Sequence, residues 1–251
     1  MTTRLMLISP AMNQALREAR FPHTEEPDGH TEEPDGDGPV GDELDALGLR
    51  EAEAVRETFP ATATATATTY VSPSLRCRRT AEALGLDAKP LPALAPCAMG
   101  RWQGRTLDEV AAAEPDALAS WLADPAAAPH GGEPLLALLA RAAHWLDTLG
   151  EATASDSGTA GDGASGGGAS GGGASGSGAP GSGTAGGRVI AVAEPDIIRA
   201  CAVHSLGATP AAFWRIDVRP LTATELSGRV GRWNLLSGRP LHSVGPRPFA
   251  L

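Results

Sequence analysis

Short apolar runs alternate along the chain with segments that carry apolar residues at helical spacing. The runs have the length of strands and are bounded by polar or turn-forming residues, which predicts buried strands. They lie at Arg4–Ile8, Thr69–Ser72 and Arg188–Ala193. Close to the end of the chain, Phe213–Val218 and Leu221–Leu226 are expected to form a strand pair.

The segments between these runs have apolar residues three or four positions apart, as in helices packed on a sheet. Asp42 or Asp45 stands where it can cap a first helix, which runs to about Phe59. Further helices are expected over residues 74–86, 106–113, 116–123, 134–149 and 195–206. Strands that alternate with helices predict an α/β fold, namely a three-layer α/β/α sandwich with a mostly parallel sheet.

Three tracts of low complexity interrupt this alternation. Residues 155–187 hold 15 of the 31 glycines, and residues 61–68 alternate Ala and Thr. Residues 23–45 contain a seven-residue repeat and ten acidic side chains. Such segments have too little apolar surface to offset the entropy lost on ordering. We therefore predict one domain over residues 1–251, with an acidic loop at 23–45 and a disordered Gly/Ser/Ala-rich insert at 155–187.

The net charge of −10 comes from the acidic loop, because the other 20 acidic residues balance the 20 basic ones. A near-neutral body does not favour nucleic-acid binding. The chain has three cysteines, Cys77, Cys97 and Cys201. Their odd number and wide spacing fit neither a disulfide framework nor a metal site. Without a long apolar run, no membrane span is expected, and a cytoplasmic location is the default. No cofactor is predicted, and the sequence identifies no protein partner.

Ligands of open α/β sheets bind beyond the carboxyl ends of the strands. Three segments follow predicted strands there, namely Ser9–Asn13, Ser72–Arg79 and Glu194–Arg199. The second has three arginines in the first turns of a helix, where backbone N–H groups also attract anions. The alternative is that these arginines are solvated or pair with nearby carboxylates. The sequence alone thus predicts an anion site without excluding a merely structural role.

Five segments, in order along the chain, resemble the histidine phosphatase superfamily, also called phosphoglycerate mutase-like. In that family the first strand ends in Arg-His-Gly, a later one leads into Ser-Pro-Leu-x-Arg, and another ends in Val-x-x-Val-x-His. Gly-x-Trp-Glu-Gly and Gly-Gly-Glu segments lie between them. The corresponding segments here are residues 5–11, 72–81, 100–110, 130–134 and 189–195.

The resemblance implies phosphoryl transfer through a phosphohistidine, with arginines and a second histidine binding the phosphoryl oxygens and a carboxylate as acid. Most of these groups are replaced in this chain. Pro10 stands at the nucleophile position, Ser9 at the first arginine, Pro96 at the acid and Glu194 at the second histidine. Of the central pocket, only Arg76 matches the family pattern.

We therefore interpret the chain as a divergent member that lacks the catalytic histidines and has a binding or regulatory role. Glu194 and Arg76 are expected to form an ion pair that closes the anion pocket. The expected ligand is a small phosphorylated or other anionic molecule. The candidate residues that bind it are Ser9, Arg76, Glu133 and Glu194. The alternative is an enzyme, a phosphatase or another, whose remodelled pocket centres on Arg76, Glu133 and Glu194. A capping role is the structural interpretation of Glu133, which stands near a helix start.

Overall fold

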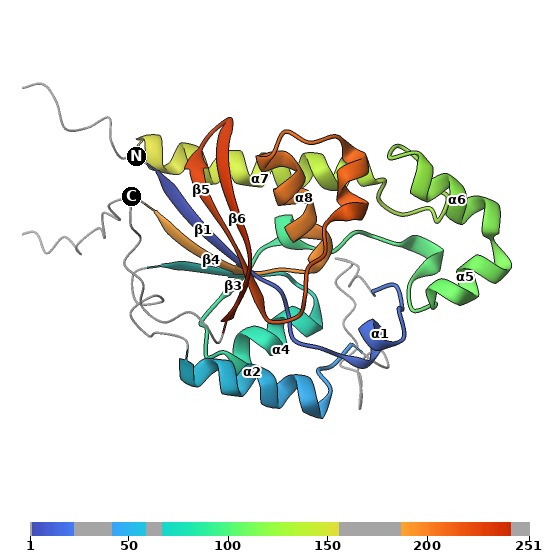
Figure 1. Ribbon diagram of the computed structural model, residues 1–251, viewed down its shortest axis with the longest axis horizontal. Coiled ribbons are helices and arrows are strands. Elements are labelled where there is room, and N and C mark those ends of the chain that lie inside the picture. The colour runs from blue at the N-terminus through green and yellow to red at the C-terminus, as the bar shows by residue number, and fades with distance from the viewer. Residues whose placement is uncertain (1, 23–41, 59–66, 156–186, 242–251) are drawn as a thin grey trace, which may run out of the picture.

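The computed structural model describes residues 2–22, 42–58, 67–155 and 187–241, and its described strands form one mixed sheet (Figure 1). The strand order is β3-β2-β4-β1-β5-β6. Neighbours from β3 to β1 are parallel, whereas the β1–β5 and β5–β6 pairs are antiparallel. The bounds are β1 Thr3–Ile8, β2 Thr68–Val71, β3 Lys89–Pro90, β4 Arg188–Val192, β5 Thr222–Arg229 and β6 Arg232–Pro240.

Helices cover both faces of this sheet, which confirms the predicted α/β sandwich. In Figure 1, α7 and α8 lie on one face, and α2 and α4 lie on the other. The short helices α5 and α6 extend to the side of the sheet. The bounds are α1 Gln14–Arg17, α2 Ala46–Thr58, α4 Leu75–Ala83, α5 Leu107–Ala113, α6 Pro115–Ala123, α7 Leu135–Ser155 and α8 Pro195–Ser205.

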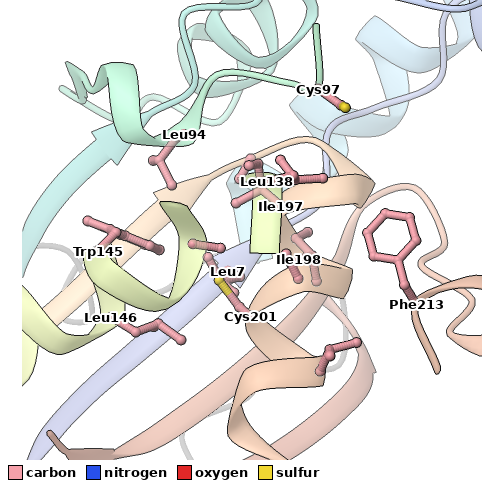
Figure 2. Packing of buried hydrophobic residues seen from close by; sticks show 14 of the residues in the cluster. Leu7, Leu94, Cys97, Leu138, Trp145, Leu146, Ile197, Ile198, Cys201 and Phe213 are labelled. Atoms are coloured by element: carbon pink, nitrogen blue, oxygen red, sulfur yellow. The ribbon is translucent and has the colours of Figure 1, made fainter. Parts of the chain in front are cut away.

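Alternation along the central strands separates the core into two clusters. Leu5 and Leu7 of β1 pack with α7 and α8, whereas Ile8 packs with α2 and α4. Figure 2 shows Leu7 of β1, Leu138 of α7 and Cys201 of α8 as members of the first cluster. Successive side chains of a strand point to opposite faces, so strands that are apolar throughout fill both layers. This explains why the central strands appear in the sequence as continuous apolar runs.

Side-chain caps explain where several helices begin. Asp45 Oδ1 accepts a hydrogen bond from Gly48 N at 2.6 Å ahead of α2, which selects Asp45 rather than Asp42 as the cap. Thr106 and Glu109 form a reciprocal capping box at α5. Pro115 and Pro195 each occupy the first position of a helix, where a missing N–H costs nothing. The helix starts are therefore local properties of the sequence.

The expected strand at Phe213–Val218 is wrong. Residues Pro210–Arg215 form a 3-10 helix that places Phe213 in the core cluster beneath α7 and α8. The terminal pair is instead β5 with β6, joined at Val230–Gly231, where Gly231 has a φ of 71°. Glycine tolerates this left-handed conformation, so the turn is possible at that point.

The three low-complexity tracts fall largely outside the described residues. The acidic loop at 23–45 is described only from Asp42, and the insert at 155–187 only at its two ends. The Ala-Thr tract is described from Ala67. No helix in the described ranges is long and apolar enough to cross a membrane. The same ranges contain no group of three or more His, Cys, Asp or Glu side chains placed to hold a metal ion.

Candidate ligand site at the carboxyl ends of the strands

The parallel pairing of β2 with β4 brings two of the candidate segments together. Val71 is paired with Val192 at the carboxyl ends of these strands. Three residues beyond the end of β2 and two residues beyond the end of β4, the chain turns into α4 and α8, with Ser74 and Glu194 at the N-cap positions. Arg76 lies in the first turn of α4 and therefore faces the start of α8. The pairing of β2 with β4 and the positions where α4 and α8 begin together bring Ser74, Arg76 and Glu194 into one site.

The predicted ion pair between Arg76 and Glu194 is present and buried. Arg76 Nη2 donates to Glu194 Oε2, and the two side chains are 8% and 10% exposed. Ser74 Oγ donates to Glu194 Oε1 at 2.9 Å, so both carboxylate oxygens are bound. Asn13 Oδ1, from the segment after β1, accepts from Arg76 Nη1 at 3.3 Å. The charge of Arg76 is thus balanced by a carboxylate of the protein itself.

A cavity of about 230 Å³ lies beside this pair, so the expected closure of the pocket is wrong. Its charged lining residues are Arg20, Asp42, Arg76, Glu194, Asp196 and Arg199. Its aromatic lining residues are Phe21, Trp121, Phe213 and Trp214. The ion pair therefore forms part of one wall and leaves room for a small molecule.

The aromatic side chains are packed edge to face. Trp121 lies 4.7 Å from Trp214 and 5.9 Å from Phe21, measured between ring centroids, with interplanar angles of 71° and 79°. Phe213 and Trp214 are 5.0 Å apart at 86°. Such arrangements are favourable because the positive edge of one ring meets the negative face of the next. The rings come from α6, the segment after α1 and the 3-10 helix at Pro210–Arg215, so this wall joins three distant parts of the chain.

Asp196 adds a desolvated carboxyl group to the cavity wall. Its oxygens accept from the backbone N–H groups of Cys97 at 2.6 Å and Ile197 at 2.7 Å. Burial raises the pKa of Asp196 to about 6, and the nearby charge of Glu194 acts in the same direction. The two N–H groups and Arg141 oppose the increase in pKa. Asp196 is therefore expected to change charge near pH 6, a property that its sequence context did not indicate.

The other candidate positions do not all converge on this cavity. Ser9 is fully buried, and its hydroxyl binds the backbone oxygens of Arg219 and Thr222. Neither Ser9 nor Pro10 belongs to the cavity lining, whereas Pro96 does. Glu133 is held by Arg141 in a two-pronged pair at 2.7 and 3.1 Å and also lies outside the lining. Of the four candidate ligand residues, the structure brings together only Arg76 and Glu194.

Several lining residues escaped the sequence analysis. Asn13, Asp196 and Arg199 stand in two of the three strand-end segments, so the strand-end rule pointed to their neighbourhood but not to their side chains. Phe21 and Trp214 lie far from any strand end. Their place in the wall depends on long-range packing, which no local pattern reveals.

The cysteines near the site are poor nucleophiles. Cys77 Sγ lies 3.5 Å from Glu194 Oε1 and is fully buried. Burial, reinforced by the charge of Glu194, raises the pKa of Cys77 well above its usual range. Burial likewise raises the pKa of Cys97, which lines the cavity. Since the thiolate is the reactive form, the raised pKa values make both thiols weak nucleophiles at neutral pH.

The comparison with family models decides the classification. The model of the histidine phosphatase superfamily (branch 1) matches residues 28–158. The chain belongs to the histidine phosphatase superfamily. The matched range includes Arg76 and Pro96 but neither Pro10 nor Glu194.

Solved structures of family phosphatases share the fold. A putative α-ribazole-5′-P phosphatase from Escherichia coli K-12 aligns with a TM-score of 0.69 and 15% identity, covering 98% of this chain and 99% of that one. A mycobacterial glucosyl-3-phosphoglycerate phosphatase in complex with VO3 aligns with a TM-score of 0.65 and 22% identity, covering 95% and 99%. At these identities the likeness concerns the fold alone. A search of curated proteins found no significant match.

Proposed function

We propose that this histidine phosphatase family protein binds a small anionic ligand without phosphohistidine chemistry and acts as a binding or regulatory protein. The observation that carries the proposal is the buried pair between Arg76 and Glu194. A phosphoryl group needs unpaired positive charge at its binding site, and here the matching arginine is already neutralised. Glu194 therefore competes with an incoming phosphate for Arg76.

The resemblance in the first strand supports the same conclusion. Pro10 stands where the family has its nucleophilic histidine, and proline has no side-chain atom that attacks phosphorus. Ser9, at the matching arginine position, is bound to the loop before β5. Two unit charges of like sign 4 Å apart repel by about 1 kcal/mol in water and by about 4 kcal/mol at an effective dielectric constant of 20. A phosphate dianion beside Glu194 is disfavoured by a repulsion of this kind.

A hydrolysis assay tests the proposal. Purified protein is incubated with p-nitrophenyl phosphate beside the variants Arg76→Ala and Arg79→Ala. Arg79 is the matched control because its side chain is 47% exposed on the same helix and pairs with Glu43 and Glu82. We expect no turnover above buffer for any of the three proteins. Turnover that disappears in Arg76→Ala and persists in Arg79→Ala would contradict the proposal.

A second candidate function rests on the contact between Ser74 and Glu194. A hydroxyl that donates to a carboxylate at 2.9 Å has the geometry of a nucleophile with its base. Ser74 also caps α4 by accepting from Cys77 N at 3.3 Å, and this structural role explains the residue without chemistry. Glu133 is not available to an alternative mechanism centred on this pair, because Arg141 holds it elsewhere.

The variant Ser74→Ala separates the two functions. If the protein is an enzyme of this second kind, turnover disappears in both Ser74→Ala and Arg76→Ala. The binding-protein proposal predicts no turnover with or without Ser74, and a loss of stability in Ser74→Ala of at least about 1 kcal/mol, since both the cap and the hydrogen bond to Glu194 are removed. Thermal unfolding of each variant shows whether a loss of activity reflects a loss of folded protein.

A further inference from the structure

The positive charge that remains for a ligand belongs to Arg199 on α8. Arg76 is paired with Glu194, and Arg20 is paired with Glu18. Arg199 donates from Nε to the backbone oxygen of Ile216 at 2.8 Å, and none of the described carboxylates forms an ion pair with it. Its guanidinium carbon lies 5.8 Å from the centre of the Phe213 ring. The backbone bond and the ring thus hold a cation at the cavity wall, with its terminal nitrogens unpaired among the described residues.

The wall next to Arg199 is aromatic and apolar. Phe213 and Trp214 follow one another in the 3-10 helix at Pro210–Arg215, and Trp121 and Phe21 complete the aromatic wall. Leu135 and Leu138 of α7 also line the cavity. A flat or apolar group therefore finds contact within reach of the guanidinium. The volume of about 230 Å³ is below the roughly 300–1,000 Å³ of drug-sized pockets, so the ligand is small.

Arg76 does not add to the charge that is available to a ligand. Its side chain is paired with Glu194, and Arg76 as a whole is 7% exposed. Its Nε is buried and has no partner in the described part of the chain. The charge of Arg76 is therefore already balanced, and Arg199 remains the cation that a ligand meets.

We propose that the cavity binds a small monocarboxylate with an aromatic or apolar body, whose carboxylate pairs with Arg199, and that it disfavours phosphate esters. This inference rests on the proposed binding function and specifies its ligand. The planar guanidinium matches a carboxylate with two parallel hydrogen bonds. The aromatic wall contacts the body of the ligand.

Charge explains the preference for a carboxylate over a phosphate. The cavity wall also holds the carboxyl groups of Asp42 and Asp196, which repel an anion when they are ionised, whereas the charge of Glu194 is balanced by Arg76. A phosphate dianion experiences this repulsion twice as strongly as a monoanion, since Coulomb energy is proportional to charge. A single unpaired guanidinium balances a monoanion, whereas a dianion bound there retains a net negative charge.

Calorimetric titration with three matched probes tests this inference. The probes are 3-phenylpropanoate, the neutral 3-phenylpropan-1-ol and the dianionic phenyl phosphate. We expect the carboxylate to bind at least about tenfold more tightly than either of the others, as one charge-assisted pair implies. Equal affinity for the acid and the alcohol, tighter binding of phenyl phosphate, or no saturable binding of the acid would each overturn the inference.

Variants of Arg199 assign the interaction to its residue. Arg199→Gln is expected to weaken 3-phenylpropanoate binding about tenfold and to leave binding of the alcohol unchanged. Arg199→Lys keeps the charge and is expected to keep the preference for the acid. Arg215→Gln is the matched control, because Arg215 is an exposed arginine in the neighbouring 3-10 helix and does not line the cavity. An equal effect of Arg199→Gln and Arg215→Gln would contradict the assignment.

Failure of this inference is distinguishable from failure of the proposed function. Phosphate release from phenyl phosphate, measured on the same protein, reports only on hydrolysis. Release that depends on Arg76 refutes the binding-protein proposal, whatever the affinities. An absence of carboxylate binding without phosphate release refutes the carboxylate ligand alone. Thermal unfolding of Arg199→Gln controls for the loss of its bond to Ile216.

Discussion

Arg76 and Glu194, 118 positions apart in the sequence, form an ion pair at the carboxyl ends of β2 and β4 with both side chains at most 10% exposed. The pair occupies the place where the family resemblance predicts an arginine and a histidine that bind phosphate. The two opposite charges balance each other in the wall of the cavity.

Breaking the pair is expected to destabilise the fold strongly. Glu194→Ala or Arg76→Met leaves one buried charge without its partner, which costs roughly 3–5 kcal/mol of unfolding free energy. The double variant Arg76→Met/Glu194→Ala leaves no unpaired charge and is expected to cost much less than the sum of the two single changes. Urea unfolding of the four proteins measures the coupling. If the losses of unfolding free energy in the two single variants add up to the loss in the double variant, the two charges do not stabilise each other.

Much of this site could be predicted from the sequence, because strands and helix starts follow from local residue patterns and their arrangement follows from one rule of sheet topology. The apolar runs of β2 and β4 predicted the strands, and Ser74 and Pro195 mark the helix starts that follow them. Parallel strands place their carboxyl ends together, which pointed to the segments that contain Arg76 and Glu194. The resemblance to the histidine phosphatase superfamily places these two positions in one pocket, and for that reason the two residues were expected to meet.

The remaining features depend on long-range packing. The hydroxyl of Ser9 points to the loop before β5, and a side-chain direction of this kind cannot be inferred from a motif. Phe213 has the apolar neighbours of a strand but is held in a 3-10 helix by packing under α7 and α8. β3, with two residues, is too short to leave a periodic pattern. The aromatic wall likewise exists only after distant segments have met.

Asp196 is expected to make stability depend on pH. The pKa of Asp196 is raised to about 6 in the folded protein, mainly by burial, against a usual value of about 3.9. Because the folded state holds the proton more tightly, the stability that protonation contributes is complete below about pH 4 and is lost as pH rises through 6. The unfolding free energy of the wild type relative to Asp196→Asn is therefore expected to fall by about 2 kcal/mol from pH 4 to pH 7.

Denaturant unfolding of both proteins over this pH range gives that difference directly. The variant removes the titration of Asp196 and leaves the neighbouring Glu194 and Arg141 in place. A difference that stays constant with pH would show that the carboxyl group of Asp196 is not desolvated in the folded protein.

Two adjacent glycines support the wall that contains Met99 and Cys97. A Cβ on Gly132 would lie 1.9 Å from the backbone oxygen of Ala98, whereas a Cβ on Gly131 meets open space. Gly131 has a φ of 78°, so Gly131→Ala introduces only the strain of a left-handed residue, roughly 1–2 kcal/mol. Gly132→Ala forces two backbone segments apart and is expected to cost more than about 3 kcal/mol.

Thermal or urea unfolding ranks the two glycine variants, with Gly131→Ala as the matched control. The segment from His130 to Glu133 packs against residues 98–101 through two backbone hydrogen bonds, Glu133 N to Ala98 O at 2.7 Å and Arg101 N to His130 O at 3.0 Å. Equal costs for the two variants would mean that this close backbone approach does not contribute to stability.

In the proposed function, Glu194 keeps phosphate away from Arg76. Titration with inorganic phosphate tests this competition most directly. The proteins compared are the wild type, Glu194→Gln and the control Glu133→Gln, whose carboxylate is bound by Arg141 outside the cavity. We predict at least about tenfold tighter phosphate binding by Glu194→Gln than by the wild type, since one opposing charge is removed and one arginine is released. Glu133→Gln is predicted to behave like the wild type. Wild-type protein that binds phosphate as tightly as Glu194→Gln would contradict the claim.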